Sequence, residues 1–329
     1  MSTLESIAAD AIYHPAHLDD RAAMRALRAA IAAHPTADLG PEGRAAFDEL
    51  IGRTPPAEGV THAAGTLGGV SGWWCRPANH RAGTAILYLH GGAYGLGSAR
   101  AYRNFAGQIA ARAQVAAFVA DYALAPERPF PAAVEDAEAA YRALADSGMA
   151  RIGIVGDSAG GGLALVTAAR MSSATRAGGV RPAAVVAMSP WTDLALTGQS
   201  YATRAQHDPL LTREALDHAR RRYLVEADIK DERASPLYGD VADLPPVLLH
   251  VGEDEILLDD ARRFAQRLKH AGSLGELHVW QDMVHVFPAN VALLHAARAA
   301  LDNIGEFLRH NLGSHSPATC VTCTHGDPQ

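Results

Sequence analysis

Short, almost wholly apolar runs alternate with helix-like segments through most of this 329-residue chain, and this alternation constrains its fold more than any other feature. A strand that is apolar on both faces is buried on both faces, as in a parallel sheet covered by helices on each side. The pattern therefore predicts an α/β fold with a doubly wound, mostly parallel sheet. The expected strands are residues 85–89, 115–120, 152–155, 183–188, 247–251 and 277–280, and the expected helices are 101–113, 132–146, 161–172, 259–271 and 291–310.

Both ends of the chain lie outside this alternation. Residues 1–50 are rich in alanine and carry apolar side chains at helical spacing, which predicts two helices separated by a break at residues 35–41. Residues 70–75 are expected to form a first strand. Residues 313–329 are polar and are expected to be a frayed, disordered tail.

One long interval also interrupts the alternation. No strand is apparent between Met188 and Val247, and the stretch from Thr212 to Glu226 is typical of an amphipathic helix capped by Thr212. We expect an insertion at about residues 195–230 to join the N-terminal helices in a lid above the carboxyl ends of the strands. Open α/β sheets bind their ligands at those ends.

Composition narrows the class of protein. The chain has 29 basic and 36 acidic residues, a formal charge of −7, so it lacks the basic surface of a nucleic-acid-binding protein. Its three cysteines do not suit a disulfide framework and favour a reducing, cytoplasmic location. The first ten residues lack the pattern of a signal peptide, and no apolar run approaches the ~20 residues that span a bilayer.

The strongest local motif is Gly156-Asp-Ser-Ala-Gly160, which lies between an expected strand and an expected helix. A serine on such a sharp turn needs small neighbours, because the backbone is strained and the helix packs close to the strand. Gly156 and Gly160 meet this need, so Ser158 is predicted to be a nucleophile. The alternative is a glycine-rich helix start that binds phosphate, but no supporting lysine or dinucleotide spacing follows it.

A serine nucleophile needs a base, and the base in turn needs an acid. His285 follows the expected strand 277–280 and is the best candidate for the base. The other histidines considered lie inside expected strands or on the last helix: His250, His278, His295 and His310. The loop 252–260 offers five carboxylates for the acid, and composition does not choose among them.

A second small-residue motif, His90-Gly-Gly-Ala-Tyr94, follows the strand 85–89. Residues without bulky side chains let backbone N–H groups point into a cavity and stabilise a tetrahedral oxyanion. We expect the N–H groups of Gly91 and Gly92 to form an oxyanion hole with that of Ala159.

These segments together resemble the hormone-sensitive-lipase-like family of α/β-hydrolase esterases over roughly residues 60–312. The resemblance also rests on three longer strings, residues 121–136, Ser189-Pro-Trp-Thr-Asp193 and Ser235-Pro-Leu-Tyr-Gly-Asp240. These strings look like structural supports for the site rather than reacting groups.

The resemblance also implies which carboxylate is the acid. In this family the acid stands about thirty residues before the histidine, and Glu255 fits that spacing to His285 better than Asp254 does. Glutamate replaces the commoner aspartate. Ala93 also stands where the family mostly has a third glycine, and a working oxyanion hole is still expected because alanine keeps its N–H.

The resemblance further implies a helical cap built from residues 1–50 and 195–230, with a catalytic domain over residues 60–312. Side chains at the boundary of the cap would set substrate size. The candidates for the pocket wall are Tyr94, Trp191, His207 and Leu210, each explained equally well by ordinary packing.

The prediction is therefore a serine carboxylesterase that hydrolyses short- to medium-chain esters through an acyl-enzyme, without a cofactor or a catalytic metal. Deacetylation of a small metabolite or lactone hydrolysis are alternatives on the same site. A non-catalytic small-molecule receptor is an alternative on the same fold, but such receptors typically lack the functional histidine. The family resemblance implies a homodimer.

A metal-binding hypothesis rests on the tail. His315, Cys320, Cys323 and His325 have suggestive spacing, but a second cysteine pair is missing.

Overall fold

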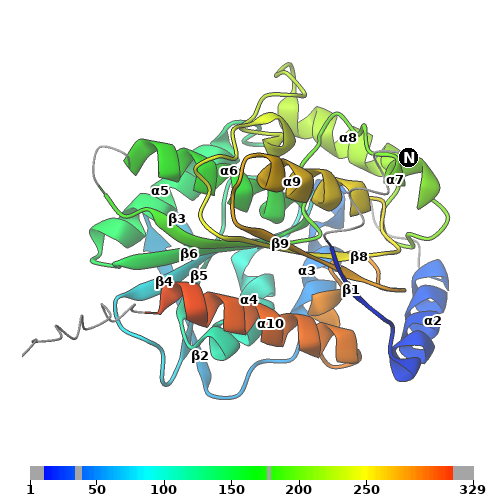
Figure 1. Cartoon of the computed structure of the whole chain (residues 1–329), viewed down its shortest axis with the longest axis horizontal. Helices are drawn as coiled ribbons and strands as arrows, with labels where there is room; N and C mark the ends of the chain where they lie inside the picture. The colour runs from blue at the N-terminus through cyan, green and yellow to red at the C-terminus, as the bar shows by residue number, and fades with distance from the viewer. Residues whose placement is uncertain (1–10, 34–38, 176–178, 314–329) are drawn as a thin grey trace, which may run out of the picture.

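A single nine-stranded sheet forms the centre of the computed structural model, which describes residues 11–33, 39–175 and 179–313 (Figure 1). The strand order is β1-β9-β8-β7-β6-β4-β5-β3-β2, and every neighbouring pair is parallel except β2 with β3 and β3 with β5. The strands are β1 (Ile12–His14), β2 (Val60–Leu67), β3 (Val70–Pro77), β4 (Thr84–Leu89), β5 (Ala116–Ala120), β6 (Arg151–Asp157), β7 (Pro182–Met188), β8 (Val247–Gly252) and β9 (Gly275–Trp280).

The parallel centre of the sheet confirms the predicted α/β fold. Every residue of β4, β5 and β8 is buried, as the continuous apolar runs indicated.

The helices lie on the two faces of the sheet, with α5, α6 and α9 packed on one face and α4 and α10 on the other (Figure 1). The helices are α2 (Leu18–Ala33), α3 (Arg44–Gly52), α4 (Ala99–Ala113), α5 (Ala132–Asp146), α6 (Ser158–Ala174), α7 (Ser200–Thr203), α8 (Arg213–Leu224), α9 (Leu258–His270) and α10 (His295–Leu312), with 3₁₀ turns at η1 (Pro41–Gly43), η3 (Pro236–Tyr238) and η4 (Phe287–Asn290).

Two edge strands were not predicted from the sequence. β1 has only three residues and pairs with β9, which places the start of the chain beside its last strand. β2 is half-exposed and pairs with β3. Neither strand shows a continuous apolar run, because an edge strand is not covered on both faces.

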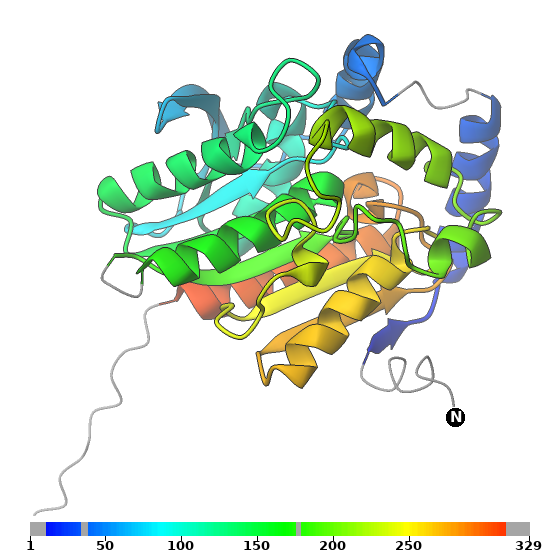
Figure 2. The same ribbon diagram turned by 90° about the horizontal axis from the view of Figure 1, so that it is seen from above.

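The segments expected to form a lid lie near the carboxyl ends of the parallel strands, where Figure 2 shows α2, α7 and α8. Thr212 caps α8 as predicted, with its Oγ1 accepting a hydrogen bond from the N–H of Ala215 at 3.1 Å. The carbonyl of Tyr223 on α8 accepts a hydrogen bond from the N–H of Phe130 at 2.8 Å, so this helix is tied to the core.

Within the described part of the chain, no helix is long and apolar enough to cross a membrane. The tail residues 314–329, including the four residues of the metal-binding hypothesis, lie outside the described residues.

Candidate active site

Ser158 stands at the junction of β6 and α6, on a turn whose backbone only small neighbours permit. Its φ of +54° lies in the left-handed region, which is strained for a residue with a side chain. A Cβ on Gly156 would come within 2.2 Å of the Gly160 carbonyl oxygen, and a Cβ on Gly160 within 2.1 Å of that of Leu89. The two glycines are therefore required by the close approach of the backbone.

The predicted base, His285, contacts Ser158, and the predicted acid, Glu255, contacts His285. Oγ of Ser158 lies 2.9 Å from Nε2 of His285, and Nδ1 of His285 lies 2.7 Å from Oε2 of Glu255. Glu255 is fully buried and Ser158 is 9% exposed. Three loops far apart in the sequence thus place a hydroxyl, an imidazole and a carboxylate in one line of hydrogen bonds.

Glu255 and Asp254 have different surroundings. The second carboxylate oxygen of Glu255, Oε1, accepts hydrogen bonds from the hydroxyl of Ser189 at 2.8 Å and from the N–H of Gly252 at 2.7 Å. Asp254 is directed to α2 instead, where its Oδ2 lies 2.7 Å from Nη2 of Arg28. Only Glu255 of the two contacts His285.

The electrostatics of the site favour a charged imidazole. Burial of His285 opposes its positive charge, but the charge of Glu255 and its hydrogen bond outweigh burial, so the pKa of His285 is raised. Asp208 and Asp157 add to this effect from farther away. A buried base that gains a stable positive charge is suited to accepting a proton from the serine.

The glycine loop after β4 corrects one expectation. The N–H of Gly91 already donates a hydrogen bond to Oδ1 of Asp157 at 3.1 Å, so Gly91 is not available as an oxyanion donor. The N–H groups of Gly92 and Ala93 donate to no acceptor among the described residues. Ala159 lies in the first turn of α6, where backbone N–H groups have no partner within the helix. The available donors are therefore Gly92, Ala93 and Ala159.

Asp157 is hydrogen-bonded to this loop through the N–H of Gly91. Its buried carboxylate accepts hydrogen bonds from the hydroxyls of Tyr88 at 2.7 Å and Tyr102 at 3.1 Å, in addition to Gly91. Burial raises the pKa of Asp157 to about 6, although these hydrogen bonds oppose the rise. Asp157, the residue before Ser158, thus fixes the backbone of the glycine loop at Gly91.

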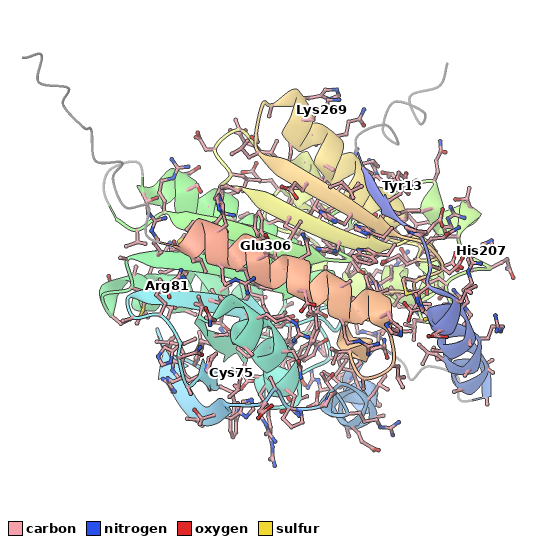
Figure 3. All side chains as sticks on the ribbon, turned by 60° about the horizontal axis from the view of Figure 1, so that its bottom comes forward. Tyr13, Cys75, Arg81, His207, Lys269 and Glu306 are labelled. Atoms are coloured by element: carbon pink, nitrogen blue, oxygen red, sulfur yellow. The ribbon has the colours of Figure 1, made fainter. Side chains whose placement is uncertain are left out.

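The four residues predicted for the pocket wall fall into two groups. Tyr94 and Trp191 are fully buried beside the site, and the ring of Tyr94 stacks on Tyr223 of α8 at 3.8 Å between centroids. Their positions are explained by packing. Leu210 is half-buried against the hydrophobic clusters, while the side chain of His207 is exposed at the edge of the molecule (Figure 3).

Comparisons with known proteins place this geometry in a family. A sequence model of the α/β hydrolase fold matches residues 86–289, well over half of the chain. The crystal structure of an esterase from the bacterial hormone-sensitive lipase family superposes with a TM-score of 0.82 and 38% identity, covering 90% of this chain and 98% of that one. The chain belongs to the hormone-sensitive-lipase-like α/β-hydrolases.

Named relatives of this hydrolase include two bacterial proteins. An acetyl-hydrolase of Streptomyces hygroscopicus is 41% identical over 261 residues, which is 79% of this chain and 84% of the relative. An esterase of Acinetobacter venetianus is 35% identical over 286 residues, which is 85% of this chain and 93% of the relative.

Two residues of the hydrolase site were not predicted from the sequence. Ser189 bonds Glu255 and also accepts a hydrogen bond from the N–H of Val286, so it joins the acid to the histidine loop. Asp208, between α7 and α8, accepts a hydrogen bond from the N–H of Ile256, next to Glu255, at 2.9 Å. Ser189 is the first residue of the string Ser189–Asp193, so the family resemblance could have indicated its role. No motif in the sequence points to Asp208.

The oxyanion loop supplies a matched pair of tests. Gly92 has a φ of +119° and a Cβ there would approach the Leu96 carbonyl oxygen to 2.3 Å, so Gly92→Ala should displace the loop. We expect kcat to fall by about 10²–10³-fold, as for the loss of one oxyanion donor. Ala93 has a φ of +53°, which costs alanine roughly 1 kcal/mol. Glycine adopts this φ without that cost and keeps the backbone N–H, so Ala93→Gly should retain most of the activity.

The measurement for this pair is kcat on p-nitrophenyl acetate together with Tm. Gly59→Ala is the control, because Gly59 also has a positive φ, +71°, but nothing lies near its Cβ position. Full activity in Gly92→Ala would contradict the assignment of the loop.

The raised pKa of His285 predicts how kcat/KM depends on pH. Only the neutral imidazole accepts the serine proton, so kcat/KM should fall as the pH drops through a pKa above the ordinary value of 6.5. Glu255→Gln removes the main effect that raises this pKa, and the acidic limb of its profile should move to lower pH. A wild-type limb below 6.5, measured with an ester whose chemistry is rate-limiting, would contradict this prediction.

Proposed function

We propose that this chain is a serine carboxylesterase in which Ser158 is the nucleophile, His285 the general base and acid, and Glu255 the orienting acid. It is a carboxylic ester hydrolase by family and by its named relatives. The observation that carries the individual roles is the line of hydrogen bonds from Ser158 through His285 to Glu255, 2.9 and 2.7 Å long.

The geometry supports a two-step reaction. Oγ of Ser158 attacks the ester carbonyl while its proton passes to Nε2 of His285, and Glu255 keeps the proton on Nδ1. The N–H groups of Gly92, Ala93 and Ala159 stabilise the oxyanion. The tetrahedral intermediate collapses with cleavage of the ester C–O bond, and His285 protonates the leaving alcohol, which leaves the acyl group on Oγ of Ser158. His285 then takes a proton from water as the water attacks the acyl carbonyl, and it returns that proton to Oγ when the acid is released.

The proposed substrates are esters of short- to medium-chain acids. The lid elements α2, α7 and α8 lie near the site, and the Tyr94–Tyr223 stack fixes α8 against the oxyanion loop. Substitutions in residues 1–50 and 195–230 should therefore change which ester is accepted more than the rate of the chemical step. The relative named acetyl-hydrolase supports including acetyl esters among the substrates.

A screen of p-nitrophenyl esters from C2 to C12, with lactones and N-acetyl amides beside them, tests this function. We expect hydrolysis of the shorter esters and covalent labelling by a serine-reactive phosphonate. Wild-type protein that hydrolyses no ester and takes no label would favour a non-catalytic receptor. Activity confined to lactones would favour a lactonase, and activity confined to N-acetyl amides would favour a deacetylase.

The homodimer stays a prediction of the family resemblance, and the cytoplasmic location stays a prediction from the cysteine content. Sedimentation equilibrium would test the first, and fractionation of the cells that make the protein would test the second.

A further inference from the structure

We propose that His17, Asp19 and His295 form a binding site for a divalent transition-metal ion of the zinc and copper type, separate from the catalytic residues. The carboxylate Oδ2 of Asp19 lies 3.6 Å from Nδ1 of His17 and 3.7 Å from Nε2 of His295. The three ligand atoms all lie within 4.8 Å of one another. Nothing in the ester hydrolysis uses these residues.

The donor set suits such an ion. Two imidazoles and one carboxylate are ligands that zinc and copper accept, with water in the remaining positions. Bonds of about 2.0–2.1 Å place neighbouring ligands of a tetrahedral ion about 3.3 Å apart. The two separations from Asp19 exceed this by a few tenths of an ångström, and all three ligand atoms lie within 4.8 Å of one another, so binding requires these exposed side chains to move closer together.

The backbone beneath the site is fixed by independent contacts. α2 lies beside the first turn of α10 (Figures 1 and 3). The carboxylate of Asp20 accepts hydrogen bonds from the N–H groups of His295 at 2.7 Å and Ala296 at 2.8 Å, and it is fully buried. The rings of His17 and His295 lie 4.5 Å apart between centroids. The ligands therefore converge before any ion binds, which lowers the entropic cost of assembling the site.

Metal binding here breaks one hydrogen bond and requires little desolvation. The N–H of Asp19 donates to Nδ1 of His17 across 3.3 Å, a long hydrogen bond that the ion would replace. All three side chains are more than half exposed, so coordination requires little desolvation of buried groups.

A metal ion here would join the start of α2 to the first turn of α10, which follows the loop that carries His285. Nε of Arg21 on α2 already bonds Asp282 at 2.9 Å, and Met24 packs in one cluster with Met283 and Phe287 around that loop. Because the ion binds only the folded arrangement of two segments far apart in the sequence, it stabilises that arrangement by mass action. We expect greater thermal stability and no change in the chemical step.

The test measures metal binding in full-length protein without an affinity tag. The tail ligands are removed in every sample by H315A, C320S, C323S and H325A, so that the tail does not bind the ion. Cu²⁺ titration followed by electron paramagnetic resonance should show one ion with nitrogen coupling from two imidazoles. Zn²⁺ should raise Tm by a few degrees.

Three variants define the site. H17A and H295A should each weaken Cu²⁺ binding by at least roughly tenfold, because even an outer-shell partner is worth 10–100-fold. Each should also remove the Tm increase with Zn²⁺. D19N keeps the size of the side chain and should weaken binding without changing the nitrogen coupling.

H270A is the matched control, since His270 is an exposed histidine at the end of α9 and should bind as the parent does. The proposal is overturned if the parent takes up no ion in a one-to-one complex, or if H17A and H295A bind as tightly as H270A. Ester hydrolysis is measured separately, so failure of the metal site leaves the proposed esterase function untouched.

Discussion

Replacing Ser158 by alanine is expected to lower kcat for p-nitrophenyl acetate by about 10⁵–10⁶-fold, the scale seen when a triad serine is removed. The variant loses the only atom that forms the acyl-enzyme in the proposed mechanism. Alanine retains the Cβ of serine, so the strain at φ +54° is unchanged and the fold should be retained. Kinetics and Tm on the same preparation measure both effects.

Ser147→Ala is the matched control for this variant. Ser147 caps the C-terminus of α5, and its hydroxyl donates a hydrogen bond to the carbonyl of Leu144, away from the proposed catalytic residues. It should retain wild-type kcat and phosphonate labelling. Ser158→Ala that is labelled as well as this control would show that the nucleophile lies elsewhere.

Glu255→Gln is expected to lower kcat by about 10⁴-fold, as when the acid of a serine triad is replaced by its amide. The amide keeps the shape of the side chain, but its NH₂ group can donate to Nδ1 of His285. The imidazole would then carry its proton on Nε2 and could not accept one from Ser158, which lies 2.9 Å away. The loss should appear in kcat rather than in KM.

Asp254→Asn is the neighbouring comparison for the acid. Asp254 pairs with Arg28 at a partly exposed position, 20% and 28% exposed respectively, so losing the charge should cost less than about 1 kcal/mol of stability. Catalysis should change little. A large loss of kcat in Asp254→Asn with little loss in Glu255→Gln would reverse the assignment of the acid.

Much of the fold could be predicted because its signals are local. α5 has the bounds that were expected, 132–146, and α8 begins after the cap at Thr212. Both follow from the spacing of apolar residues and from capping chemistry within a few positions. β1 was missed because three half-exposed residues carry no such pattern, and it exists only by pairing with β9 more than 260 residues away.

The site residues also divide into those that local sequence predicts and those that it does not. A serine between small residues on a strand-to-helix turn, and a histidine in the loop after a strand, are properties of short segments that can be read directly. Choosing Glu255 over Asp254 needed the family resemblance, since both stand in one acidic loop. The contact that separates them in space is with His285, thirty residues farther on.

By itself, the sequence determined the fold class and predicted Ser158 as the nucleophile, His285 as the base and a glycine loop after the strand 85–89. Only the tertiary structure decided that the N–H of Gly91 donates to Asp157. It also decided that Ser189 supports Glu255 and that His17 meets His295. The physical reason is that a hydrogen-bonding group is free or engaged according to what lies within about 3 Å of it. In this fold those neighbours come from segments that the chain itself keeps far apart.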